Sequence, residues 1–144
     1  MRPSFESIYA RLAALMSERS TCERLHVGAV ITSQDFRRVL SVGYNGNASK
    51  LPNTCDSTTV GACGCLHAEE NAIINCCEPR DTLKIFFVTD SPCVLCAKRI
   101  VNLGGVLCVY YLRPYRVTQG LEILHTVGIA TYHLQDEEKI LYGA

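Results

Sequence analysis

The amino-acid sequence predicts an α/β protein with a three-layer α/β/α architecture, in which helices cover both faces of a mixed five-stranded sheet. The first observation is that runs rich in β-branched and aromatic residues alternate with stretches of helical character. The second is that Gly, Pro, Asn and Asp separate these segments. The third is the length of 144 residues, which suits one hydrophobic core. We therefore expect residues 1–144 to form a single domain.

The first predicted element is an amphipathic helix over residues 5–16. Apolar residues recur there at spacings of three and four, which is the pattern of one buried helix face. These residues are Phe5, Ile8, Leu12, Leu15 and Met16. Ser4 directly precedes the helix and is a suitable N-cap, because its side chain can accept a hydrogen bond from a free backbone N–H.

Two paired strands are predicted next, over residues 27–32 and 38–44, with the turn between them at residues 33–35. An Asn-Gly pair at positions 45 and 46 then begins a long loop. Scattered Gly, Pro, Asn, Asp, Ser and Thr continue this loop to about residue 64.

Helices and strands alternate in the rest of the chain. Pro92 is well placed as the first residue of a helix, and glycines at 104, 105 and 128 are stop signals. The predicted elements are a helix over 67–77, a strand over 83–89, a helix over 93–103, a strand over 106–112, a helix over 121–127 and a strand over 129–134.

The composition is that of an ordinary globular protein, with 48% apolar and 19% charged residues. Lys plus Arg and Asp plus Glu both number 14, so the chain has no general electrostatic attraction for nucleic acid. The first twenty residues lack the ~7–15-residue apolar run of a signal peptide, and no stretch approaches the ~20 residues of a membrane span. We expect a cytoplasmic protein with neither a nucleic-acid nor a membrane partner.

Nine cysteines are an unusually high number for such a chain. The number is odd and no export signal is visible, so metal binding is a better explanation than disulfides. Two tight pairs stand out, Cys63 with Cys65 and Cys93 with Cys96. Three others lie in apolar surroundings and are predicted to be small core residues: Cys76, Cys77 and Cys108.

The strongest functional signal combines His67-Ala68-Glu69 with the segment Pro92-Cys93-Val94-Leu95-Cys96. A catalytic zinc takes three protein ligands and keeps one position for water, and His67, Cys93 and Cys96 supply that number. Glu69 is the candidate group for moving protons during hydrolysis. H-x-E with P-C-x-x-C is the signature of zinc-dependent nucleobase deaminases, so the pair of motifs is far more specific than either motif alone.

Four segments resemble the deoxycytidylate deaminase family, which belongs to the cytidine deaminase superfamily. They are RSTCERLHVGAVI (19–31), GYNG (43–46), LHAEENAI (66–73) and SPCVLCAKRI (91–100). The match continues in order to about residue 129, although the loop before residue 67 and the C-terminus are short for the family. The resemblance implies the sheet order 2-1-3-4-5 and the conversion of dCMP to dUMP by a zinc-activated hydroxide that attacks C4 of cytosine.

The same resemblance implies the roles of several residues. Glu69 would shuttle protons, Asn45 would bind the sugar, the backbone N–H of Ala68 would meet the pyrimidine carbonyl, and Val27 would line the base pocket. For Asn45 the alternative is a plain Asn-Gly turn. The resemblance further implies a homohexamer that dCTP and dTTP regulate as effectors.

Phosphate recognition is predicted from the loop before residue 27, which contains Ser20, Thr21 and Arg24. An arginine fork and hydroxyl donors suit a monophosphate. The alternative is a solvated surface loop, and Arg113 and Arg116 compete for the same role. Tyr115 either flanks the substrate or simply packs.

A second, structural zinc is predicted on four of the remaining cysteines: Cys22, Cys55, Cys63 and Cys65. Four thiolates make a closed zinc site, and the long loop has little apolar content to hold it in place. Some family members are similar in this respect. The alternatives are scattered free cysteines, or a Cys63–Cys65 pair, without metal.

Four rival functions stay open at this point. The substrate could be another cytosine nucleotide, such as dCTP or a 5-substituted dCMP, or cytosine in nucleic acid, which a neutral chain disfavours. A deaminase of the free nucleoside fits the segments at 19–31 and 43–46 less well. A catalytically silent zinc module would have no need of Glu69.

Overall fold

A computed structural model describes residues 2–22, 24–55, 63–135 and 139–140. The helices in this part of the chain are α1 (Phe5–Ser17), α2 (Ala68–Asn75), α3 (Val94–Leu103) and α4 (Gln119–Thr126). The strands are β1 (Gly28–Ser33), β2 (Val39–Tyr44), β3 (Lys84–Asp90), β4 (Val106–Arg113) and β5 (Ala130–His133). Each predicted helix and strand is present, and the bounds differ by a few residues at most.

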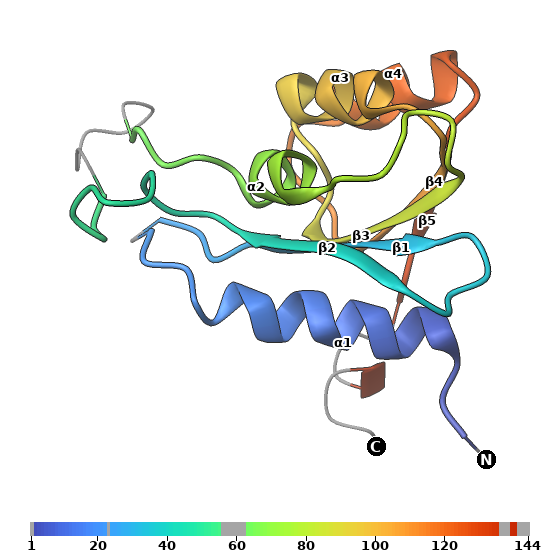
Figure 1. Ribbon diagram of the computed structural model, residues 1–144, viewed down its shortest axis with the longest axis horizontal. Coiled ribbons are helices and arrows are strands. Elements are labelled where there is room, and N and C mark those ends of the chain that lie inside the picture. Colours follow the sequence, from blue (N-terminus) through green and yellow to red (C-terminus); the bar gives the residue numbers. More distant parts are fainter. Residues whose placement is uncertain (1, 23, 56–62, 136–138, 141–144) are drawn as a thin grey trace.

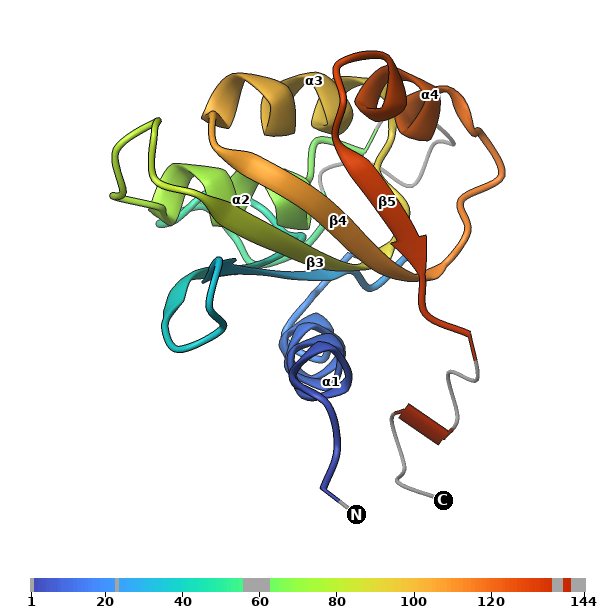
Figure 2. The ribbon, with the colours of Figure 1, turned by 90° about the vertical axis from the view of Figure 1, so that its right-hand side faces the viewer.

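The strands form one mixed sheet in the order β2-β1-β3-β4-β5, as the family resemblance implies. Strand β1 is antiparallel to both β2 and β3, whereas β3, β4 and β5 are parallel to one another. Helix α1 covers one face of the sheet, and α2, α3 and α4 cover the other (Figures 1 and 2). The prediction of a three-layer α/β/α fold is therefore confirmed.

Apolar residues of the central strands alternate between the two faces, and each set forms its own core. Phe86, Val88 and Val109 belong to the core beneath the three-helix layer. Val30 and Phe87 belong to the core beneath α1. Strand β3, in the middle of the sheet, is buried on both faces, which explains its nearly continuous apolar sequence.

Helix α1 packs against the sheet through small side chains. Ser4 is its N-cap, as predicted, and accepts a hydrogen bond from the backbone N–H of Ser7 at 3.1 Å. Ala10 and Ala13 are buried, and a Cβ on Gly28 would lie only 1.8 Å from the carbonyl oxygen of Ala13. The predicted buried face is wrong for three larger residues, which are exposed: Phe5, Ile8 and Leu15. The close approach of helix and strand leaves no room between them for side chains of that size.

The predicted burial of three cysteines is correct for one of them. Cys108 is buried on β4, Cys76 is half-buried and Cys77 is exposed. Helix α2 ends at Asn75, two residues before the predicted end at residue 77. Cys77 therefore lies outside the helix and beyond the packed layer.

None of the helices in the described residues has the length and apolar character needed to cross a membrane. Of the predicted loop at 45–64, residues 56–62 lie outside the described part of the chain. The segments on either side of them meet through an antiparallel bridge between Gly46 and Leu66.

Candidate active site

Three predicted metal ligands meet where α2 and α3 begin. His67 is the N-cap of α2, Cys93 is the N-cap of α3, and Cys96 lies in the first turn of α3. The Nδ1 atom of His67 is 3.7 Å from Sγ of Cys93 and 3.3 Å from Sγ of Cys96. All three ligand atoms lie within 4.8 Å of one another. Neighbouring ligands of a tetrahedral zinc are roughly 3.5 Å apart, so the set fits this ion.

The electrostatics of this cluster favour a cation. The hydrogen bond with Cys96, together with His67, lowers the pKa of Cys93 to about 3. The hydrogen bond with Cys93 raises the pKa of His67 to about 9, and the same thiol neighbour and burial raise the pKa of Cys96. Without a metal, the cluster therefore holds a thiolate beside an imidazolium. A bound metal replaces these protons, because its ligands must be deprotonated.

Two adjacent glutamates in the first turn of α2 have different surroundings. Glu69 is buried, with 4% of its surface exposed, and burial raises the pKa of its carboxyl to about 7. Glu70 accepts a hydrogen bond from the backbone N–H of His67 at 3.0 Å and pairs with Arg99 at 3.5 Å. Because His67 has extended backbone at the very start of the helix, Glu69 can line the same cavity as His67 although only two positions separate them.

Helix α2 is held close to the sheet by the absence of a side chain on β2. A Cβ on Gly43 would lie 2.4 Å from the carbonyl oxygen of Ala68. Two positions earlier in the strand, Ser41 donates a hydrogen bond to the carbonyl of Ala72. The last residues of β2 thus fix the height of Glu69 above the sheet.

A cavity of about 410 Å³ opens beside the metal cluster. Most of the predicted site residues line it: Val27, Arg24, Asn45, His67, Ala68, Glu69, Cys93 and Tyr115. Three thiols of the second predicted cluster also reach it: Cys22, Cys63 and Cys65. Of the two competing arginines, Arg116 lines the cavity, and Arg113 instead pairs with Asp90 at 3.0 Å.

Ser20 and Thr21 are not among the residues that line the cavity. Ser20 is buried, and its hydroxyl accepts a hydrogen bond from the backbone N–H of Cys22 at 3.2 Å. Thr21 donates to the side-chain oxygen of Asn53 at 3.0 Å. In this structure Ser20 stabilises the local backbone at Cys22, and Thr21 links this loop to the one that carries Asn53.

Asn45 connects the end of β2 to the segment before β1. Its side-chain oxygen accepts a hydrogen bond from the backbone N–H of Val27 at 2.8 Å, and its side-chain nitrogen donates to the carbonyl of Leu25 at 2.5 Å. The residue is therefore more than a bare turn, because its buried amide shapes the wall of the cavity on which Val27 lies.

Sequence reasoning missed three residues of this cavity, namely Leu25, Asp90 and Ser91. Asp90 and Ser91 directly precede the Pro-Cys pair. Their position before a metal-ligand motif, at the carboxyl end of a predicted strand, is a signal that could have found them.

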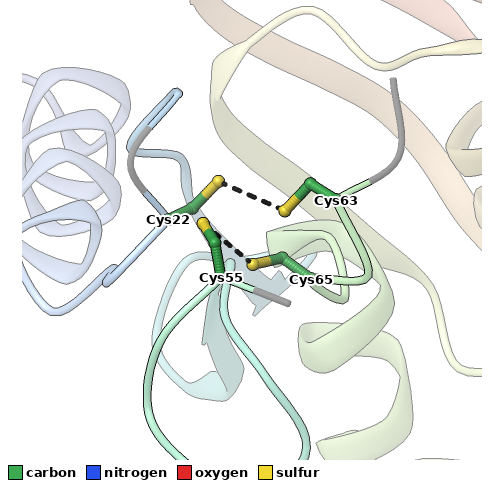
Figure 3. Close-up of side chains that lie close together, drawn as sticks. All are labelled: Cys22, Cys55, Cys63 and Cys65. Carbon is green, nitrogen blue, oxygen red and sulfur yellow. Dashed lines mark hydrogen bonds between the residues drawn. The ribbon is translucent and has the colours of Figure 1, made fainter. Parts of the chain in front are cut away.

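The four remaining predicted ligands form a second cluster beside the cavity, and three of them line it. Sγ of Cys22 is 3.9 Å from Sγ of Cys63, and Sγ of Cys65 is 3.7 Å from Sγ of Cys55 (Figure 3). All four sulfur atoms lie within 4.8 Å of one another. Ligand sulfurs of a tetrahedral zinc are roughly 3.8 Å apart, so the set fits a closed structural site.

The thiols of this four-cysteine cluster differ in their affinity for protons. Burial raises the pKa of Cys22, but hydrogen bonds from the backbone N–H groups of Arg24 and Leu25 outweigh it and bring the pKa down to about 7. Burial raises the pKa of Cys65. A thiolate at Cys22 gives a cation its first anionic ligand at neutral pH.

A His-Cys-Cys cluster beside a buried glutamate, at helix N-termini on a mixed sheet, is the arrangement of the zinc-dependent nucleobase deaminases. The family model for the cytidine and deoxycytidylate deaminase zinc-binding region matches residues 3–112. The chain therefore belongs to this deaminase family.

Individual relatives agree with this assignment. The chain is 34% identical to the deoxycytidylate deaminase of Saccharomyces cerevisiae over 98% of its own length, and it spans about half (49%) of that relative. It is 31% identical to ComE operon protein 2 of Bacillus subtilis, with 97% of the chain and 76% of the relative covered. The crystal structure of dCMP deaminase from cyanophage S-TIM5 with dCMP and dUMP superposes with a TM-score of 0.82 at 34% identity, covering 93% of the chain and 99% of the phage protein.

Proposed function

We propose that this protein is a zinc-dependent deoxycytidylate deaminase, which converts dCMP and water to dUMP and ammonia. The observation that carries the proposal is the buried carboxyl of Glu69 in one cavity with His67 and Cys93, which form a three-ligand cluster with Cys96. The similar phage enzyme, whose crystal structure contains dCMP and dUMP, supports the choice of substrate.

The metal would be held by His67, Cys93 and Cys96. When bound, zinc supplies a Lewis acid that lowers the pKa of a water molecule from about 15.7 to about 7. Glu69 would take one proton from the attacking water and pass it to N3 of cytosine, and would then take the second proton, from the new hydroxyl on C4, and deliver it to the leaving 4-amino group as the C4–N bond breaks. Its raised pKa, which burial causes, suits a group that must both accept and donate protons near neutral pH.

The substrate would lie between the wall formed by Val27 and the start of α2. The backbone N–H of Ala68 would donate to the pyrimidine carbonyl, and Asn45 would border the sugar. Arg24 would bind the phosphate, because it is exposed at the rim of the same cavity and offers a bidentate fork. Ser20 and Thr21 would contribute only by holding that loop.

A turnover assay across cytidine, deoxycytidine and their mono- and triphosphates tests the substrate. We expect the highest kcat/KM for dCMP, and a panel with 5-substituted dCMP and single-stranded DNA covers the alternatives. Preference for dCTP, for a modified base or for DNA would overturn the assignment to dCMP. Absence of turnover on every cytosine compound by the zinc-loaded protein would overturn the enzymatic function.

We also infer a second, structural zinc on the four-cysteine cluster, which the sulfur separations support. Elemental analysis of the purified protein should find about two zinc ions per chain. One zinc per chain, with the four thiols titratable by a thiol reagent in the folded protein, would contradict the second site.

Assembly, regulation and location are inferred from the family resemblance. We infer a homo-oligomer, a hexamer, whose activity dCTP and dTTP modulate, and a cytoplasmic location, since reduced thiols as metal ligands suit a reducing compartment. Light scattering, and initial rates with and without each triphosphate, test the first two. A monomer, or rates that neither triphosphate changes, would contradict them.

A further inference from the structure

Ser91 joins the metal-ligand segment to the loop that leaves β4. It is the first residue after β3 and stands two positions before the ligand Cys93. Its backbone N–H donates to the carbonyl of Arg113 at 2.9 Å. Its hydroxyl oxygen accepts a hydrogen bond from the backbone N–H of Tyr115 at 2.6 Å. The side chain is buried, with 4% of the residue surface exposed, so this contact is shielded from water.

The loop between β4 and α4 is fixed at both ends as well. At its start Arg113 pairs with the carboxylate of Asp90 at 3.0 Å. At its end, α4 rests on the segment before Cys93, since a Cβ on Gly120 would lie 2.0 Å from the carbonyl oxygen of Pro92. Figure 2 shows this loop leaving the end of β4 and rising beside the sheet to α4. Ser91 holds the middle of a loop whose ends are already anchored.

The middle of this loop carries the two residues that line the cavity, Tyr115 and Arg116. Arg116 is exposed, so its backbone decides which way its guanidinium can reach. Arg24 and Arg116 are the two arginines among the residues that line the cavity. The position of one of these cations therefore depends on a hydrogen bond to Ser91.

We propose that Ser91 is a positioning residue that holds the Tyr115–Arg116 loop against the phosphate end of a bound nucleotide. This inference rests on the proposed function. Ser91 acts through the loop and not on the reacting atoms, so its loss affects the binding of the phosphorylated substrate and leaves the chemical step in place. Removing the hydroxyl would also leave the Tyr115 N–H without its buried acceptor, which favours a displaced loop.

The test compares wild type, Ser91→Ala and Ser91→Thr on dCMP and on deoxycytidine, with zinc content measured on each preparation. For Ser91→Ala we expect KM for dCMP to rise roughly tenfold, the effect of one lost buried hydrogen bond, with kcat within about twofold. kcat/KM for deoxycytidine should change little, and Ser91→Thr, which keeps the hydroxyl, should restore much of the affinity. Thr32→Val is the control. It also removes a buried hydroxyl, but near the end of β1 that does not line the cavity, so it should leave both KM values unchanged.

Arg116→Ala keeps the proposal testable if Ser91→Ala does not fold. It should show the same loss specific to dCMP, and the double variant should lose little more than either single variant, because both changes remove the same contact. Equal losses on dCMP and deoxycytidine, loss of zinc in Ser91→Ala, or an unchanged KM for dCMP in Arg116→Ala would each overturn the positioning role. A wild-type protein inactive on every cytosine compound would instead overturn the proposed function.

Discussion

Glu69 and Glu70 are chemically identical neighbours that the fold assigns to different tasks. Glu70 faces polar partners, the N-cap of α2 and Arg99, and completes the local structure of the helix. Glu69 is surrounded by protein and faces the cavity, so its carboxyl retains a proton near neutral pH. Burial of a carboxylate costs free energy, and a fold usually retains such a residue at a functional site.

Replacement of Glu69 by Ala should therefore abolish turnover while zinc stays bound, because this residue is not among the three ligands. The expected loss in kcat is at least the ~10²–10⁴-fold that general acid–base catalysis contributes. Initial rates and zinc content on one preparation measure both effects. Glu70→Ala is the matched control and should keep most activity; near-wild-type turnover by Glu69→Ala would remove this residue from the mechanism.

The buried carboxyl also predicts a pH dependence of stability in the metal-free protein. Burial raises the pKa of Glu69 from 4.5 to about 7, so the folded state binds more protons than the unfolded state between these values. The contribution of this carboxyl to the free energy of unfolding is therefore greatest below pH 4.5, and it is lost as the pH rises to about 7. Metal-free Glu69→Gln should exceed metal-free wild type in stability at pH 8, by up to about 3 kcal/mol, and lose this advantage at pH 4. Urea unfolding at both pH values measures the difference; an advantage independent of pH would contradict the account.

Arg24→Ala should lower kcat/KM for dCMP far more than kcat/KM for deoxycytidine, because only the nucleotide carries a phosphate for the guanidinium to bind. The comparison is kcat/KM for the two substrates in variant and wild type. Arg37→Ala, an exposed arginine in the β1–β2 turn, is the control and should change neither value. Equal losses on both substrates would show that Arg24 does not read the phosphate.

At the scale of elements, small residues decide how closely the helices approach the sheet. Ala10 and Ala13 of α1 meet Gly28 of β1, and the start of α2 meets Gly43 of β2. These contacts set how closely α1 and α2 lie against the sheet, and the N-termini of α2 and α3 lie together at one end of it. The predicted metal ligands lie at those N-termini, where the helix dipoles favour thiolates.

Gly28→Ala should consequently be among the most destabilising single changes in the protein. Its new Cβ would meet the carbonyl oxygen of Ala13 at 1.8 Å and the backbone nitrogen of Ser17 at 2.7 Å, so α1 would have to move. We expect a loss above ~3 kcal/mol, the range of severe overpacking. Gly46→Ala is the control, since its Cβ would approach no atom closer than 3.8 Å and should cost less than ~1 kcal/mol. Thermal or urea unfolding distinguishes the two; similar losses would refute the close-packing explanation.

At the scale of the whole molecule, the four-cysteine cluster connects three separate segments of the chain. Cys22 precedes β1, Cys55 follows β2, and Cys63 and Cys65 precede α2 (Figure 3). Three of these thiols also line the cavity. A metal here would fasten together the segments that carry Arg24, Asn45 and His67, so its binding free energy would contribute to the order of the substrate site.

Cys55→Ser should reduce the zinc content from about two ions to about one, lower Tm and raise KM for dCMP. The loss of one thiolate opens the closed site, and the segments around the cavity are then held less tightly. Zinc analysis, calorimetry and steady-state kinetics on the same protein test the three effects. Cys77→Ser, at an exposed thiol outside both clusters, should alter none of them. Unchanged zinc in Cys55→Ser would return the four cysteines to a role without metal.

The sequence by itself determined the order of elements, the pair of deaminase motifs and the residues of the two predicted metal-binding clusters. These features depend on local patterns: strands and helices follow from periodicity and turn residues, and motif spacing reflects ligand chemistry. The family resemblance supplied the sheet order, which local patterns do not encode.

Only the tertiary structure decided which residues line the cavity and which face α1 buries. The outward position of Ile8 and Leu15 follows from the contact between Ala13 and Gly28, residues far apart in sequence. Likewise Ser91 and Arg116 meet the cavity because the parallel ends of β3 and β4 lie together, whereas Ser20 and Thr21 are drawn into hydrogen bonds beside it. Long-range packing distributes side chains of similar chemistry between the site and its supports, and no local pattern contains that information.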